Sequence, residues 1–178
     1  MEKAKIIEQA INLGARDARV IRVDAVKTAA WVALKCRYGC DHYGKSLCCP
    51  PHTPTYKETR EVLKDYSYAV LIQSQTLEDT TDLALNLERA LFKLGYHKAI
   101  GFGAGKCLLC SDCTMALCTR PFEARPSMEA CGMDVMATVK ASGIPIRSVA
   151  DGPVALGPES PNSPEDTACC GYGLVLID

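Results

Sequence analysis

The sequence predicts an α/β fold, because segments with helical periodicity alternate with short apolar segments typical of buried strands. The clearest helix is 80–94, where leucines and an alanine recur on one face and Gly95 ends the segment. The clearest strand is 68–72 (Tyr-Ala-Val-Leu-Ile). We therefore expect one domain, residues 1–178, with a mixed β-sheet, flanking helices and cysteine-rich loops at one end of the sheet.

The other elements follow from the same signals. Further helices are predicted at 2–14, at 56–65, and from Ser127, a good N-cap, to the stop at Gly143 and Pro145. Further strands are predicted at 19–23, 99–102, 146–149 and 173–177. The segment 28–35 fits a helix or a strand equally well. Proline and glycine predict loops at 36–55 and 151–168.

Composition excludes several classes of protein. Apolar residues make up 48% of the chain and the formal net charge is −1, which excludes a disordered chain and gives no basic excess for nucleic acid. Only three Phe, seven Tyr and one Trp are present, too few for a base-stacking platform. No stretch approaches the roughly 18 apolar residues of a membrane span. The N-terminus lacks the apolar run of a signal peptide, so we expect a cytoplasmic location.

The eleven cysteines are the exceptional feature of the composition. A few could be small buried hydrophobes, but ten of them gather in three tight groups. Disulfides would need an oxidising compartment, and an odd number of cysteines fits a closed disulfide framework poorly. The pattern therefore favours reduced thiols that bind metal.

The strongest metal signal is C-x2-C-x2-C-x4-C, followed shortly by Pro121. The four cysteines are Cys107, Cys110, Cys113 and Cys118. Bacterial ferredoxins use C-x2-C-x2-C-x3-C-P, in which one compact loop offers thiolates to three corners of a cubane. Zinc sites prefer two separated C-x2-C pairs. The spacing therefore favours a [4Fe–4S] cluster, with zinc as the alternative.

A second ligand set lies upstream and looks incomplete. Its cysteines are Cys36, Cys40, Cys48 and Cys49. Side chains of neighbouring residues diverge, so Cys48 and Cys49 do not easily bind one metal together. Cys49, stiffened by two following prolines, is the favoured ligand.

The fourth ligand of this set is open. Cys131 could supply it from an apolar helix face, but a core cysteine is at least as good a reading. Cys169 and Cys170 are ligands, redox thiols or a packing pair, and His42 is a ligand or a surface residue.

The glycines before Cys107 have two interpretations. The run Gly101-x-Gly103-x-Gly105 is similar to a dinucleotide motif, but that motif must open a helix and this one opens a cysteine loop. The glycines instead let backbone amides approach the cluster sulfurs, or they form a tight turn.

Several of these segments together resemble one family. They are Lys35-Cys-Arg-Tyr-Gly-Cys40, Tyr43-Gly-Lys, Cys49-Pro-Pro, Gly105-Lys-Cys-Leu-Leu-Cys110-Ser-Asp-Cys113 and Arg125-Pro-Ser-Met-Glu-Ala-Cys131-Gly-Met-Asp. The sequence resembles the predicted metal-binding proteins of anaerobic bacteria and archaea, domain-of-unknown-function family 2284, from about residue 16 onward. The resemblance implies cysteine-based metal binding of the iron–sulfur kind and no established reaction. Cys48 and the pair Cys169–Cys170 depart from the family's pattern.

Three functions follow from these patterns. The leading hypothesis is a redox or electron-transfer accessory protein, whose partner would be an acidic redox protein docked by basic residues that flank the cysteines. These residues are Lys35, Arg37, Lys45, Lys106, Arg120 and Arg125. The second is an enzyme with an open iron, although no acid–base set accompanies it. The third is a structural zinc domain for assembly. The sequence does not indicate the oligomeric state.

Overall fold

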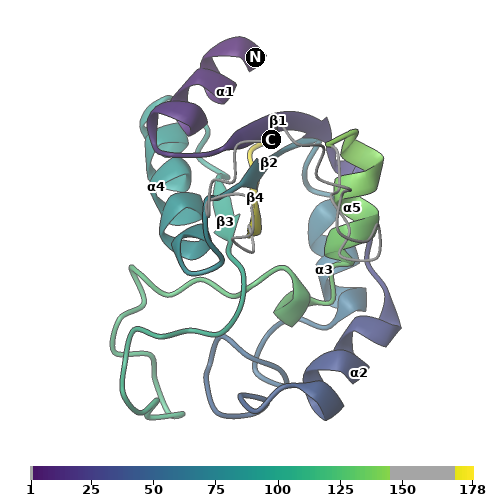
Figure 1. Ribbon diagram of the computed structural model, residues 1–178, viewed down its shortest axis with the longest axis vertical. Helices are drawn as coiled ribbons and strands as arrows, with labels where there is room; N and C mark the ends of the chain where they lie inside the picture. Colours follow the sequence, from purple (N-terminus) through teal and green to yellow (C-terminus); the bar gives the residue numbers. More distant parts are fainter. Residues whose placement is uncertain (1, 145–170) are drawn as a thin grey trace, which may run out of the picture.

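The fold has three layers, with a four-stranded sheet between two layers of helices (Figure 1). The structure is a computed structural model that describes residues 2–144 and 171–178. The described helices and strands, in chain order, are α1 (Lys3–Asn12), β1 (Asp17–Arg22), η1 (Val23–Ala25), α2 (Ala30–Gly39), α3 (Tyr56–Leu63), β2 (Tyr68–Gln73), α4 (Asp79–Lys93), β3 (Ile100–Phe102), η2 (Glu129–Cys131), α5 (Val135–Ser142) and β4 (Tyr172–Leu176).

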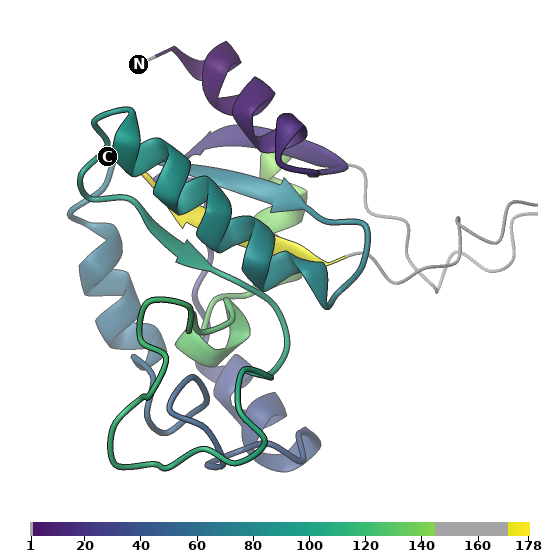
Figure 2. The ribbon, with the colours of Figure 1, turned by 90° about the vertical axis from the view of Figure 1, so that its left-hand side faces the viewer.

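The strand order is β1-β2-β4-β3, and every pairing among these strands is antiparallel. The predicted α/β class is confirmed, but the sheet is antiparallel instead of mixed. The reason is the place of the last strand. β2 and β3 run in the same direction, joined through α4, and β4 lies between them, so they do not form a parallel pair (Figure 2).

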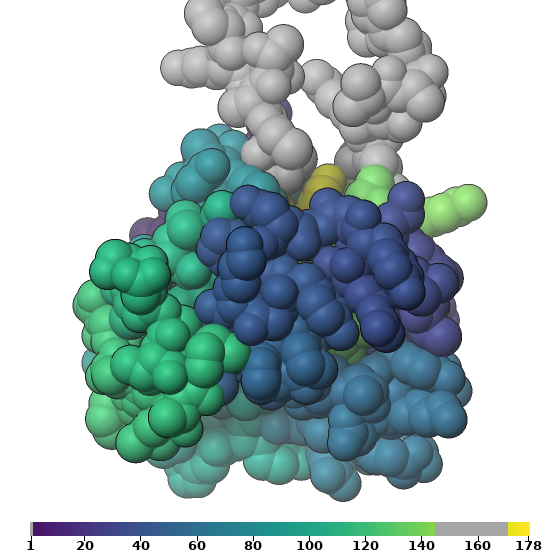
Figure 3. Space-filling view, turned by 90° about the horizontal axis from the view of Figure 1, so that it is seen from below, coloured from purple at the N-terminus to yellow at the C-terminus, as the bar shows by residue number. Residues whose placement is uncertain are grey.

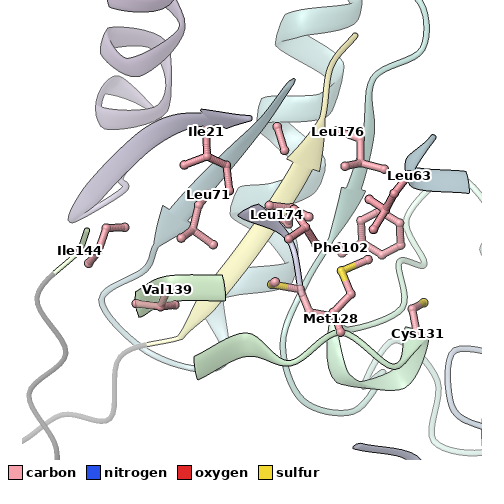
Figure 4. Packing of buried hydrophobic residues seen from close by; sticks show 13 residues of the cluster. Ile21, Leu63, Leu71, Phe102, Met128, Cys131, Val139, Ile144, Leu174 and Leu176 are labelled. Atoms are coloured by element: carbon pink, nitrogen blue, oxygen red, sulfur yellow. The ribbon is translucent and has the colours of Figure 1, made fainter. Parts of the chain in front are cut away.

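The central strands are apolar on both faces because helices cover both sides of the sheet. Along β2, Val70 and Ile72 face α1 and α4, whereas Ala69 and Leu71 face α3 and α5. The second face carries the core cluster shown in Figure 4, which also includes Met128. This core ends where the cysteine-rich part of the chain begins.

Two predicted boundaries differ from the structure. The predicted helix from Ser127 is interrupted, because Gly132 adopts a left-handed φ of 72° and ends η2 before α5 begins. The ambiguous segment 28–35 lies mostly in α2, which continues to Gly39, so Cys36 lies on a helix and not in the predicted loop. The predicted strand 146–149 and loop 151–168 lie outside the described residues.

Two long connections lie together at one end of the molecule, the lower end in Figure 1. The first cysteine loop (residues 40–55) joins α2 to α3, and the second cysteine loop (residues 104–126) follows β3. Backbone hydrogen bonds close the base of the second loop, from Gly103 to Pro126 at 2.9 Å and from Met128 to Gly103 at 3.1 Å. No helix among the described residues has the length and hydropathy needed to cross a bilayer.

Candidate metal centre

The two cysteine loops enclose a hollow of about 60 Å³. The loops lie against each other in the space-filling view from below (Figure 3). Five thiols line this thiol hollow: those of Cys48, Cys107, Cys110, Cys113 and Cys118. The four cysteines of the C-x2-C-x2-C-x4-C pattern therefore meet around one space. The side chains of His42, Lys45 and Arg120 also line it.

Backbone amides already point at one of these sulfurs. The amides of Leu47 and Met115 hydrogen-bond to Cys113 and lower the pKa of its thiol, because such bonds favour the thiolate. Met115 is the one residue other than glycine with a positive φ, 60°, in the described chain. A left-handed backbone costs energy for a residue with a side chain. Here the strained residue is the one whose amide donates to the Cys113 sulfur.

The neighbouring residues Cys48 and Cys49 turn to different sides, as the sequence predicts for adjacent side chains. Cys48 lines the thiol hollow, and burial together with the nearby Cys107 raises the pKa of Cys48 to about 12. For Cys49, burial and then the nearby Cys40 raise the pKa of the thiol. The Cys49 sulfur accepts a hydrogen bond from the Cys107 amide. The dipeptide thus contributes one thiol to each of two adjacent groups.

The second of these groups is a three-thiol cluster formed by Cys36, Cys40 and Cys49. Burial, followed by the nearby Cys40, the Glu129 carboxylate and Cys49, raises the pKa of Cys36. The Cys36 sulfur lies 4.0 Å from the backbone oxygen of Glu129. The His42 amide donates to the Cys40 sulfur at 3.5 Å.

Cys131 lies apart from both groups. Its side chain is fully buried in the apolar core beside Met128, and Figure 4 shows it among the core side chains. Burial alone raises the pKa of Cys131 to about 12, with no contribution from another cysteine. The structure therefore places it as a core cysteine. Cys169 and Cys170 lie outside the described residues.

The second cysteine loop is fixed to α4 by a largely buried ion pair. Arg125 binds both carboxylate oxygens of Glu88, and Glu88 also accepts the Gly101 amide at 2.7 Å. The Gly103 amide bonds to Pro126, so neither glycine amide serves a sulfur. A side chain at Gly103 would overlap Thr81, with a Cβ 2.1 Å from its hydroxyl oxygen. These glycines are thus tight-packing positions, and no helix follows them before residue 128.

Two basic side chains, Lys45 and Arg120, line the thiol hollow, and Lys106 lies next to Cys107 in the sequence. The pKa of the Arg120 guanidinium is raised mainly by its ion pair with Glu123, and in addition by the nearby Cys110 and Cys107. Lys45 is exposed at the rim, and Lys106 lies 4.0 Å from Asp41. Cationic neighbours favour thiolates over thiols, so the hollow suits anionic sulfur ligands.

The thiols surround a space but do not converge on one point. In residues 2–144 and 171–178, no three Cys, His, Asp or Glu side chains are arranged tightly enough to hold a single ion. A zinc ion needs four donors about 2.3 Å from its centre. In a cubane each thiolate binds a different iron, so the donors stand around the rim of a larger body.

Sequence reasoning missed three contributors to the site. The amide of Leu47 and the left-handed Met115 leave no signal in the sequence, because backbone direction is set by the folded loop. Glu129 is the third, and it gives only a weak signal, a single carboxylate in an otherwise apolar segment two residues before Cys131.

The comparison with known families agrees with the cysteine pattern. The sequence model of a family described as "Predicted metal-binding protein (DUF2284)" matches residues 19–157. No curated protein and no solved structure gave a significant match.

Proposed function

Because the chain belongs to the DUF2284 family of predicted metal-binding proteins, we propose that it is an iron–sulfur protein of the [4Fe–4S] type that serves as a redox accessory protein. The observation that carries the proposal is the set of five thiols around one hollow. The proposed ligands are Cys107, Cys110, Cys113 and Cys118. Such a cluster would supply one-electron transfer at a potential set by hydrogen bonds to sulfur and by solvent exposure.

The residues around the hollow support this role. The amides of Leu47 and Met115 and the cations Lys45 and Arg120 stabilise negative charge at the sulfurs. Cys48 stands beside Cys107 as a fifth thiol. It places a thiol of the first cysteine loop beside the four ligands proposed from the second loop.

Metal analysis after oxygen-free purification tests the proposal. We expect a brown protein with at least about four irons and as many inorganic sulfides per chain, because one cubane holds that number. Chelation of the iron should destabilise the second cysteine loop, because all four proposed ligands lie in it. A colourless protein with about one zinc per chain would overturn the proposal and favour a structural zinc domain.

An acidic redox protein is the proposed partner. The exposed face of α2 carries Trp31, Leu34 and Tyr38, and the second cysteine loop exposes Leu117 and Phe122, so apolar side chains border the site. Exposed Lys35, Arg37 and Lys45 stand among them. An apolar contact area with a cationic rim suits a short-lived complex with a partner that has an anionic surface. In that complex one electron would pass between the partner and the metal site.

An anionic small oxidant tests this charge pattern without knowledge of the partner. Ferricyanide should oxidise the reduced protein more slowly as salt rises, and the Lys45→Glu variant should react roughly two- to tenfold more slowly at low salt, because the local attraction is lost. Lys5→Glu makes the same charge change on α1, far from the loops (Figure 1), and should leave the rate nearly unchanged. Equal rates for the two variants at matched iron content would contradict the proposal.

A further inference from the structure

The three-thiol cluster of Cys36, Cys40 and Cys49 has the Glu129 carboxylate beside it, and one oxygen of this carboxylate has no hydrogen-bond partner. We propose that these three thiolates and the Glu129 carboxylate hold a second metal centre, with Glu129 as its single oxygen ligand. The inference rests on the proposed iron–sulfur character of the chain. It adds a second centre and identifies its fourth ligand, which the cysteine pattern leaves open.

The first support is the state of the Glu129 side chain. Its Oε2 atom is buried and has no hydrogen-bond partner, and it is the one buried side-chain oxygen or nitrogen in the described chain of which this is true. No lysine or arginine among the described residues forms an ion pair with Glu129. The Ser127 hydroxyl and the Glu129 amide hydrogen-bond to this carboxylate but leave Oε2 without a partner. An unpartnered carboxylate oxygen in a buried position is costly, and a bound cation would remove that cost.

The second support is position. Glu129 begins η2, which packs against α2, and its backbone oxygen is 4.0 Å from the Cys36 sulfur. Its carboxylate is near enough to act electrostatically on Cys36, as Cys40 and Cys49 also do. The carboxylate and the three thiols therefore belong to one electrostatic neighbourhood, assembled from α2, the first cysteine loop and η2.

The third support is the framework that holds these segments together. The Thr53 hydroxyl donates to the Ala130 carbonyl at 2.5 Å, and the Thr59 hydroxyl donates to the Cys131 carbonyl at 2.6 Å. The Ala29 amide donates to the Gly132 carbonyl at 3.0 Å. The middle and the C-terminal end of η2 are thus fixed to the first cysteine loop, to α3 and to the residue before α2, which holds the segment after Glu129 in place before any metal binds.

Other candidates for the fourth ligand fit less well. Cys131 points into the apolar core and has no electrostatic contact with the three thiols. Cys107 gives its amide to Cys49 but its thiol lines the neighbouring hollow. Three thiolates and one carboxylate combine soft sulfur ligands with one harder oxygen ligand. The iron bound by the oxygen would exchange its ligand more easily than the other irons. All four donors bind as anions, and their protons pass to solvent on loading.

Iron and sulfide content with electron paramagnetic resonance tests the proposal on the full-length chain, reconstituted without oxygen. We expect about eight irons per chain in the natural protein, and about four in Cys110→Ser, which retains the second centre. Glu129→Gln should lose between one and four irons and change the resonance spectrum, although glutamine keeps the size and hydrogen bonding of the side chain. Glu129→Cys should restore the iron content with an altered spectrum, because a thiolate then replaces the oxygen ligand.

Glu61→Gln is the matched control, because Glu61 is an exposed carboxylate of α3 paired with Lys64, away from both thiol groups. It should leave iron content and spectra unchanged. A purely structural role for Glu129 would not be rescued by cysteine, so iron loss in both Glu129 variants would overturn the ligand assignment. Full iron content and an unchanged spectrum in Glu129→Gln would also overturn it.

The two proposals fail in different ways. About four irons in the natural protein, all lost in Cys110→Ser, would reject the second centre and leave the proposed function intact. Absence of iron and sulfide from every form of the protein would reject both.

Discussion

Replacement of Cys110 by serine should remove about four irons and four sulfides per chain, the whole content of the thiol hollow. Cys110 is exposed, lines the hollow and has the Thr119 hydroxyl 3.7 Å from its sulfur. Serine keeps the size and polarity of the side chain but is a poor thiolate substitute, so one corner of the cluster loses its ligand. Iron and sulfide assays on the oxygen-free variant measure the loss.

Cys131→Ala is the control that separates ligation from packing. Because Cys131 is enclosed by core side chains, its loss should leave the iron content unchanged and lower the free energy of unfolding by about 1–2 kcal/mol through the cavity it leaves. Thermal unfolding measures the second effect. If Cys131→Ala lost iron while Cys110→Ser kept it, the assignment of ligands would be wrong at both positions.

The sequence predicts most of the fold because hydrophobic periodicity determines helices and strands locally. The helix predicted at 80–94 corresponds to α4, and the strand predicted at 68–72 corresponds to β2. The antiparallel sheet was not predictable in this way. It depends on β4 inserting between β2 and β3, a long-range pairing that leaves no local trace. The break at Gly132 was missed although its signals are local, a glycine that adopts a left-handed φ and the N-cap Asp134 that begins α5.

For the candidate site, the sequence predicted which cysteines lie together but not how the two loops arrange them. Cysteine spacing indicated that Cys107, Cys110 and Cys113 act together, and the structure brings them to one hollow with Cys118. The addition of Cys48 to that hollow could not be read from the sequence, because it depends on how the first cysteine loop folds against the second. Spacing alone indicates which cysteines can come together, while the folded loops decide how the thiols divide between the thiol hollow and the three-thiol cluster.

Gly132→Ala should lower the free energy of unfolding by about 3 kcal/mol, the largest stability change that we expect from a single methyl group here. Gly132 has a φ of 72°, and an added Cβ would lie 2.6 Å from the Tyr56 Cβ and 2.8 Å from its Cα. A side chain cannot relax away from the strained φ, and the Tyr56 backbone that it contacts cannot move aside as a flexible side chain could. The displaced segment carries Glu129 at one end, so iron in the second centre should also decrease.

Gly143→Ala isolates the first of these two causes. Gly143 has nearly the same φ, 75°, but its added Cβ would meet only the end of Arg19, at an ordinary 3.8 Å. We therefore expect a loss of about 1 kcal/mol from backbone strain alone. The difference of about 2 kcal/mol corresponds to a melting temperature roughly 4–8 °C lower for Gly132→Ala in a chain of this size. Equal melting temperatures for the two variants would show that η2 can move away from α3, in which case Glu129 would not be held in place beside the three thiols.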